Sequence, residues 1–169
     1  DGTGTGASFN RPKGIITDGT NLYVGDFDNN RIRQIVISSG VVTTLAGSGT
    51  ATFANGTDTS ASFQYPTGIE TDGTNLFVAD RNNHRIRMIV ISTGVVTTIA
   101  GSGDYAFANG TGTSASFKYP TGITFDGTDL YVSDYSNHRI RKIAGRITET
   151  AVVSLLNLDD DTVVTVAVS

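Results

Sequence analysis

The chain of 169 residues contains no cysteine and no tryptophan, and it has only three prolines and one methionine. The lack of cysteine excludes a disulfide framework and a thiolate metal site, but it leaves the redox compartment open. Charged residues are also scarce, at 17%, and the formal net charge is −4. Phosphate binding needs a clustered cationic face, so this balance argues against a nucleic-acid partner. No apolar stretch approaches the ~20 residues that span a bilayer, so no membrane span is expected.

What the chain does contain is an internal repeat. The string at residues 65–87, YPTGIETDGTNLFVADRNNHRIR, occurs three times in similar form at a constant spacing of 54 residues. A period of this length indicates repeated supersecondary units that bury their apolar faces against one another. The copies keep the same register at five positions, which are the series Phe9, Phe63, Phe117; Pro12, Pro66, Pro120; Asp18, Asp72, Asp126; Asp26, Asp80, Asp134; and Arg31, Arg85, Arg139.

Each copy reads as short strands joined by tight turns. In the first copy, four apolar segments lie at residues 14–17, 22–25, 31–37 and 41–46. Asp18-Gly19 and Ser39-Gly40 between them suit tight turns, because aspartate caps its own turn and glycine accepts a positive φ. Connections this short join antiparallel neighbours, so each copy predicts a four-stranded meander. Meanders in series are typical of the blades of a β-propeller.

Several motifs carry a resemblance to a known family. Asn83-His84-Arg85-Ile86-Arg87 and its copy at residues 137–141 follow Pro-x-Gly-Ile and Leu-(Phe/Tyr)-Val-(Ala/Ser)-Asp, and together they resemble the NHL repeat. The first copy departs from the pattern, with Asn30 where histidine is expected. The resemblance covers residues 9–143 and implies an all-β, NHL-type propeller, which usually closes with about six blades.

The repeat divides the chain into four parts. Residues 1–8 form a partial inter-blade connector, and blades with their connectors follow at residues 9–62, 63–116 and 117–169. The chain starts inside a connector, which indicates either a cut longer protein or an offset repeat. After residue 143 the repeat breaks, and the tail at 144–169 has two β-branched runs, at 151–158 and 162–168, which predict a hairpin. Val163-Val164-Thr165 resembles Val95-Val96-Thr97, which favours the second run as the fourth strand of blade three.

Three blades leave a closure problem, because three wedges at normal twist do not surround an axis. Both end blades would expose an apolar face, and such faces drive association. Two chains related by a two-fold axis would form a six-bladed ring, so we expect a homodimer. A fragment of a larger ring and an open, fibre-like assembly are the alternatives.

The candidate binding residues lie mostly on the turn between the second and third strands of each copy. The spacing Asp26-x-Asp28-x-Asn30 resembles a calcium loop, but the downstream Glu and Gly are absent. We therefore expect each aspartate to cap the turn and to pair with an arginine of the same or a neighbouring blade. The histidines sit at equivalent places on separate blades, which favours a packing role over a metal site. Glu70 breaks the repeat and is expected at the channel or a blade interface. The candidates are Asp26, Asp80, Asp134, His84, His138 and Glu70.

Near-identity of the copies predicts a non-catalytic scaffold that binds a protein or a small ligand on its loop face or channel, without a cofactor. One alternative, implied by the resemblance, is a lyase or hydrolase with a divalent metal in the channel. The other is a filament or surface-assembly subunit that uses the tail to pair with a neighbour. The glycine-, serine- and threonine-rich connectors and the low lysine content favour an extracellular or periplasmic protein.

Overall fold

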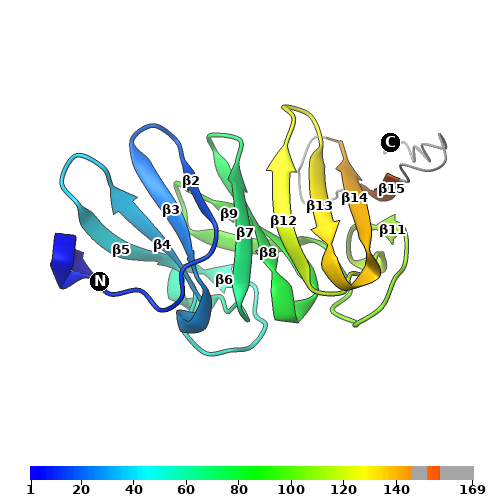
Figure 1. Ribbon diagram of the computed structural model, residues 1–169, viewed down its shortest axis with the longest axis horizontal. Helices are drawn as coiled ribbons and strands as arrows, with labels where there is room; N and C mark the ends of the chain where they lie inside the picture. The colour runs from blue at the N-terminus through cyan, green and yellow to red at the C-terminus, as the bar shows by residue number, and fades with distance from the viewer. Residues whose placement is uncertain (146–151, 157–169) are drawn as a thin grey trace.

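The computed structural model describes residues 1–145 and 152–156, and these form three antiparallel sheets of five strands each. The sheets follow one another along the chain and stand side by side, like the blades of a propeller (Figure 1). Sheet 1 has the strand order β1-β5-β4-β3-β2, and sheets 2 and 3 repeat this order. Sheet 1 comprises β1 (Gly2–Thr3), β2 (Ile15–Thr17), β3 (Asn21–Asp26), β4 (Arg31–Val36) and β5 (Val41–Ala46).

The same five strands recur in the other two sheets. Sheet 2 comprises β6 (Gly56–Thr57), β7 (Pro66–Thr71), β8 (Asn75–Asp80), β9 (Arg85–Val90) and β10 (Val95–Ala100). Sheet 3 comprises β11 (Gly110–Thr111), β12 (Pro120–Phe125), β13 (Leu130–Asp134), β14 (Arg139–Ala144) and β15 (Val152–Leu156). The four predicted strands of each copy are therefore present. Among the described residues, no helix is long and apolar enough to cross a membrane.

The prediction of four strands per unit was incomplete, because the connectors add a fifth. In sheet 2, Gly56 and Thr57 pair with Val96 and Val95 at the outer edge. Residues 1–8 do the same for sheet 1, where Gly2 pairs with Val42. Each connector thus runs along the outer edge of the sheet it leads into, forms a 3-10 turn (η1, Gly4–Gly6; η3, Asp58–Ser60; η5, Gly112–Ser114), and then turns inward. The added strand covers backbone groups that an open edge would expose.

The fourth strand of sheet 3 also differs from the expectation. The first run of the tail supplies it, since β15 pairs with β14 from Ile140↔Leu156 to Ala144↔Val152. The preference for the second run, at 162–168, was therefore wrong; that run, and with it the predicted hairpin, lies outside the described residues. Sequence similarity to residues 95–97 favoured the later run. The first run lies nearer to β14 in the chain, so its pairing with β14 closes a shorter loop and costs less entropy.

The innermost strands β2, β7 and β12 lie next to one another, with β7 between the other two. Glycine makes this close approach possible at Gly14, just before β2, and at Gly68 in β7. A Cβ on Gly68 would lie 2.3 Å from the Thr121 carbonyl oxygen, and a Cβ on Gly14 would lie 2.3 Å from that of Thr67. The amide of Gly14 donates to the Thr67 carbonyl at 3.0 Å, which links sheets 1 and 2. A side chain at either glycine would force the inner strands apart.

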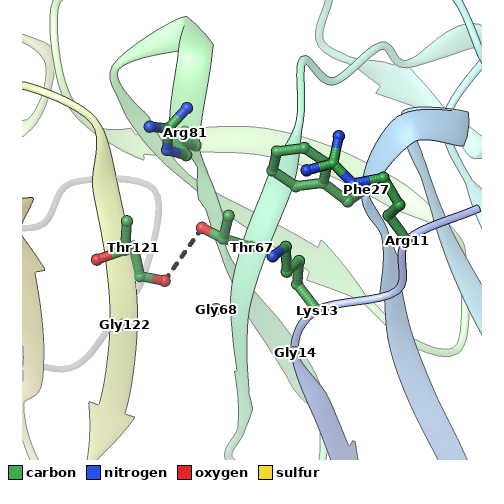
Figure 2. Close-up of a pocket in the computed structure, with 9 residues that line it drawn as sticks. All are labelled: Arg11, Lys13, Gly14, Phe27, Thr67, Gly68, Arg81, Thr121 and Gly122. Carbon is green, nitrogen blue, oxygen red and sulfur yellow. Dashed lines mark hydrogen bonds between the residues drawn. The ribbon is translucent and has the colours of Figure 1, made fainter.

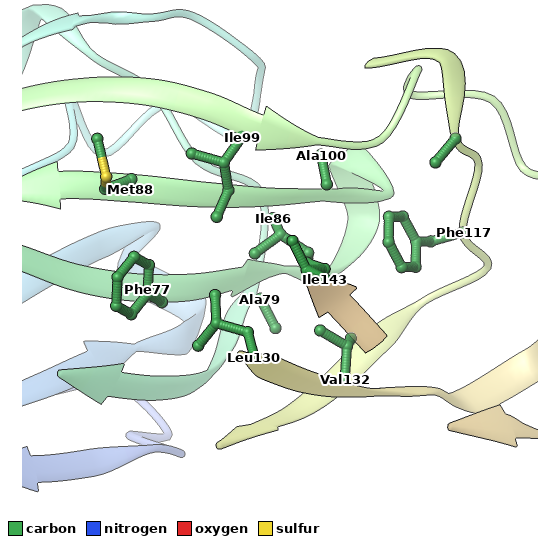
Figure 3. Close-up of a cluster of buried hydrophobic side chains, with 11 residues drawn as sticks. Phe77, Ala79, Ile86, Met88, Ile99, Ala100, Phe117, Leu130, Val132 and Ile143 are labelled. Atoms are coloured by element: carbon green, nitrogen blue, oxygen red, sulfur yellow. The ribbon is translucent and has the colours of Figure 1, made fainter. Parts of the chain in front are cut away.

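The core lies between the sheets and follows the alternation of each strand. In β8, Leu76 and Val78 pack toward sheet 1, whereas Phe77 and Ala79 pack toward sheet 3. Figure 3 shows the second of these layers, in which Phe77 and Ile86 of sheet 2 meet Leu130, Val132 and Ile143 of sheet 3. Sheet 2 is therefore buried on both faces, and sheets 1 and 3 on one face each.

Candidate functional site

The three predicted aspartates each end the second strand of a sheet, and each is fully buried. Asp80 is representative: its carboxylate accepts hydrogen bonds from the Gln64 amide at 2.8 Å, Asn83 Nδ2 at 2.9 Å and Arg87 Nη1 at 2.8 Å. Asp26 pairs with Arg33 and Asp134 with Arg141, both at 2.9 Å. The pairing of each aspartate with an arginine of the same sheet is thus as predicted, but none of the three side chains caps the 3-10 turn that follows it.

The arginine of each pair fastens the incoming connector to its sheet. Arg87 also donates to the carbonyl oxygens of Ser62, at 3.0 Å, and Ala54, at 2.8 Å. Burial opposes charge on both partners, so it raises the pKa of Asp80 and lowers that of Arg87, and their attraction acts in the opposite direction. Every partner of the Asp80 carboxylate is a donor, so its oxygens are occupied by the protein.

His84 joins two sheets. After the 3-10 turn η4 (Arg81–Asn83), it takes the left-handed conformation, with φ 54°, and its Nδ1 accepts the Tyr119 amide of the next sheet at 3.2 Å. Asn30 does the same after η2 (Phe27–Asn29), where its Oδ1 accepts the Tyr65 amide at 3.0 Å. Asparagine and histidine tolerate this backbone conformation better than most residues. We expected a packing or turn role for this histidine. In the structure, His84 accepts a hydrogen bond that links two sheets.

Protonation of His84 would remove this acceptor. Burial lowers the pKa of His84, and the charges of Arg85 and Arg81 lower it further. At pH 8 the ring is neutral in both folded and unfolded chains, and as the pH falls through about 6.5 the unfolded chain binds the proton first. The histidine therefore costs stability as the pH falls from about 7 toward 5.

We expect the variant His84→Asn to lose less stability than the unmodified protein between pH 8 and pH 5. Asparagine keeps an acceptor, as Asn30 does in the preceding sheet, but it does not titrate. Melting temperatures of both proteins at the two pH values measure the difference. An equal drop in both proteins would contradict the coupling.

The remaining candidates lie apart from this junction. His138 follows η6 (Tyr135–Asn137) with φ 56° and is exposed, because no further sheet follows in the described part of the chain. Glu70 is half-buried on the innermost strand β7, where its Oε1 accepts the Thr71 amide at 2.9 Å. Among the described residues, no three histidine, cysteine, aspartate or glutamate side chains come together as metal ligands.

A cavity of about 580 Å³ lies at the end of the molecule where the innermost strands begin. We call it the inner-strand pocket. Each sheet contributes two neighbouring residues to its lining, which are Lys13 and Gly14, Thr67 and Gly68, and Thr121 and Gly122. The remaining lining residues are Arg11, Phe27 and Arg81. In Figure 2 the Thr67 hydroxyl points toward the backbone of Thr121, whose carbonyl oxygen it reaches at 3.1 Å.

The sequence interpretation missed Arg11, Lys13 and Arg81. A signal was present, because these positions differ between copies that otherwise agree. Arg11 corresponds to Tyr65 and Tyr119, Lys13 to Thr67 and Thr121, and Arg81 to Phe27 and Tyr135. Of the positions at which the copies differ, the sequence interpretation noticed only Asn30 and Glu70.

Comparisons with known proteins agree with this architecture. A family model of the NHL repeat matches residues 117–143. Human NHL repeat-containing protein 2 is 35% identical over 166 residues, which cover 89% of this chain and 22% of that protein. The chain thus spans about a fifth of this relative.

Two solved structures have a similar fold. Auxiliary nutrient binding proteins of Bacteroides thetaiotaomicron and Bacteroides ovatus superpose with TM-scores of 0.65 and 0.63, at 22% and 24% identity. The matches cover 78% and 76% of this chain and 36% and 35% of those proteins. At these identities the likeness concerns the fold alone.

Proposed function

Because the chain belongs to the NHL-repeat family, we propose that it is a non-catalytic binding scaffold, half of a six-bladed propeller that a second copy completes. Its three sheets are the blades of the repeats at residues 9–62, 63–116 and 117–169, except that the short outer strand of each blade comes from the connector before it. The inner-strand pocket, at the mouth of the channel, is the ligand site, whereas Asp26, Asp80 and Asp134 stabilise the scaffold through their buried arginine pairs. His84 holds a blade junction, and Glu70 lines the channel further along β7. The names of the nutrient binding proteins of similar fold support a binding role. The glycine-, serine- and threonine-rich connectors and the low lysine content support a place outside the cytoplasm.

The observation that supports closure of the ring by a second copy is that some apolar residues are exposed although their equivalents in another copy are buried. Ile15 on sheet 1 is 59% exposed, whereas Ile69 at the same place on sheet 2 is 6% exposed. Ile140 on sheet 3 is 38% exposed, whereas Ile86 is fully buried. Each of these residues faces outward from an end sheet where an internal sheet has a neighbour. The two end faces are therefore the two halves of one missing junction.

A second copy supplies both halves at once. With a two-fold axis, sheet 3 of each copy meets sheet 1 of the other, and the two junctions are identical. The polar contacts also match, since His138 corresponds to the acceptor His84 and Arg11 corresponds to the donor Tyr119. Arg11 already has φ 52°, close to the 51° of Tyr119, so its amide is set for the same bond.

Light scattering across a dilution series tests the closure. We expect a mass of two chains that persists on dilution, because two core-like interfaces form together. A single-chain mass at all concentrations would show that a second copy does not cover these faces. Species larger than two chains would contradict a closed ring and favour an open assembly.

A further inference from the structure

The lining of the inner-strand pocket points to one class of ligand. We propose that the pocket binds a small organic anion that carries a phosphate group or several carboxylates, held by Arg11, Lys13 and Arg81. The inference rests on the proposed binding role of this end of the propeller, but it does not require ring closure. All the lining residues come from one chain, so the site exists in a single copy.

Charge is the first argument. The chain as a whole carries −4, yet the pocket has three cationic side chains and no carboxylate in its lining. Within residues 1–145, the one acidic contact of these cations is at the rim, where Arg11 Nη1 lies 3.3 Å from Asp28 Oδ2 in an exposed pair. Such a pair contributes little and can exchange for a ligand oxygen. A concave site lined by one sign of charge concentrates the field and attracts ions of the opposite sign.

Each cationic group also lies over an aromatic ring. The Arg81 guanidinium lies 4.4 Å from the centroid of the Tyr119 ring, and its Nη1 donates to Asn82 Oδ1 at 2.9 Å. Arg11 and Lys13 both lie over the Phe27 ring, at 5.4 Å and 5.5 Å from its centroid. Figure 2 shows Arg11, Lys13 and Phe27 on one side of the pocket, with Arg81 set apart from them. Ordering before binding reduces the entropy that a ligand must overcome.

The pattern of differences between copies is the second, independent argument. Residues in or beside the lining that build the fold are the same in all copies, as Pro12, Gly14 and Asp26 show. The positions of Arg11, Lys13 and Arg81 alternate with them and differ. The fold does not require cations there, since the other copies carry tyrosine, threonine and an aromatic residue at the positions of Arg11, Lys13 and Arg81, respectively. A binding role at this end of the molecule, in addition to the role of these positions in the fold, explains why cations replace those residues.

The chemistry and size of the site narrow the ligand. Arginine forms paired hydrogen bonds with phosphate and carboxylate groups, and lysine adds a compact charge. A cavity of about 580 Å³ suits a small molecule, and Phe27 offers an apolar wall beside the charges. A nucleic-acid strand would extend beyond the pocket over a chain of net negative charge, which disfavours it.

Titration calorimetry of the full chain with pyrophosphate and with citrate tests the proposal. We expect at least one probe to bind, and which one binds distinguishes a phosphate site from a carboxylate site. The double variant Lys13→Thr/Arg81→Tyr should weaken binding at least tenfold. Both new residues occur at the same places in other copies, so the fold is expected to remain, and a melting curve confirms it.

Lys142→Gln is the matched control. Lys142 lies outside the pocket and pairs with Asp129, and the first copy carries Gln34 at this position. The control should bind the probe as the unmodified protein does. Absence of binding by both probes, equal weakening in the control and the double variant, or tighter binding of a short single-stranded RNA would each overturn the proposal. The mass of the same sample distinguishes the anion site from ring closure. Anion binding by single chains would overturn ring closure alone. Two-chain rings that do not bind the anion would overturn the anion site alone.

Discussion

Replacing Ile140 by aspartate is expected to convert two-chain particles into single chains. The substitution places a charge at the centre of the proposed junction, where the equivalent Ile32 and Ile86 are fully buried. A buried, unpaired carboxylate opposes association strongly. Both junctions of the ring contain this residue, so one substitution affects both. Light scattering of the variant at several concentrations measures the change.

Val95→Asp provides a control of the same chemistry. Val95 is 38% exposed, like Ile140, but its equivalent Val41 is 36% exposed, so this position faces solvent in both copies. The control should keep the mass of the unmodified protein. If Ile140→Asp also keeps that mass, the end face of sheet 3 is not the dimer junction.

Replacing Arg87 by methionine is expected to lower the free energy of unfolding by about 3–5 kcal/mol, as is typical when one partner of a buried ion pair is removed. The methionine fills much of the same space, but it leaves the fully buried Asp80 carboxylate without its counter-charge. It also removes the donors to the carbonyl oxygens of Ser62 and Ala54. Urea unfolding at fixed protein concentration measures the loss.

The same substitution at Arg11 should cost less than about 1 kcal/mol, because its pair with Asp28 is exposed to water. Equal losses at Arg87 and Arg11 would mean that the buried pair does not fasten the connector. A large loss at Arg87 alone would show that sheet 2 depends on its Asp–Arg pair.

Much of the fold was predictable because three copies report on the same structure. The continuous apolar run Leu76-Phe77-Val78 marks a strand buried on both faces, and the repeated Asp80 and Arg87 mark a pair that every sheet needs. The two-residue strands such as β6 were not predictable, since Gly56 and Thr57 show no alternation and pair only through their backbone. The choice between the two runs of the tail likewise depended on pairing with β14, which composition does not reveal.

The candidate site was predictable only in part. Residues that recur were recognised, and Asp80 and His84 proved to hold sheets and connectors together. The cationic lining was harder to find, because Arg11, Lys13 and Arg81 come from two copies and meet only when the innermost strands begin side by side. Comparison of the copies for differences, rather than for agreement, is the signal that identifies them.

The hydrogen bond between neighbouring sheets uses the backbone of the donor residue and not its side chain. Tyr65 and Tyr119 hold the preceding sheet through a backbone amide, so the acceptors Asn30 and His84 do not depend on the side chain that the donor carries. Arginine stands at the corresponding place in the first copy with the same backbone geometry. Side chains at this position can therefore be exchanged without loss of the joint. Substitutions at this position can thus change the charge of the inner-strand pocket one repeat at a time.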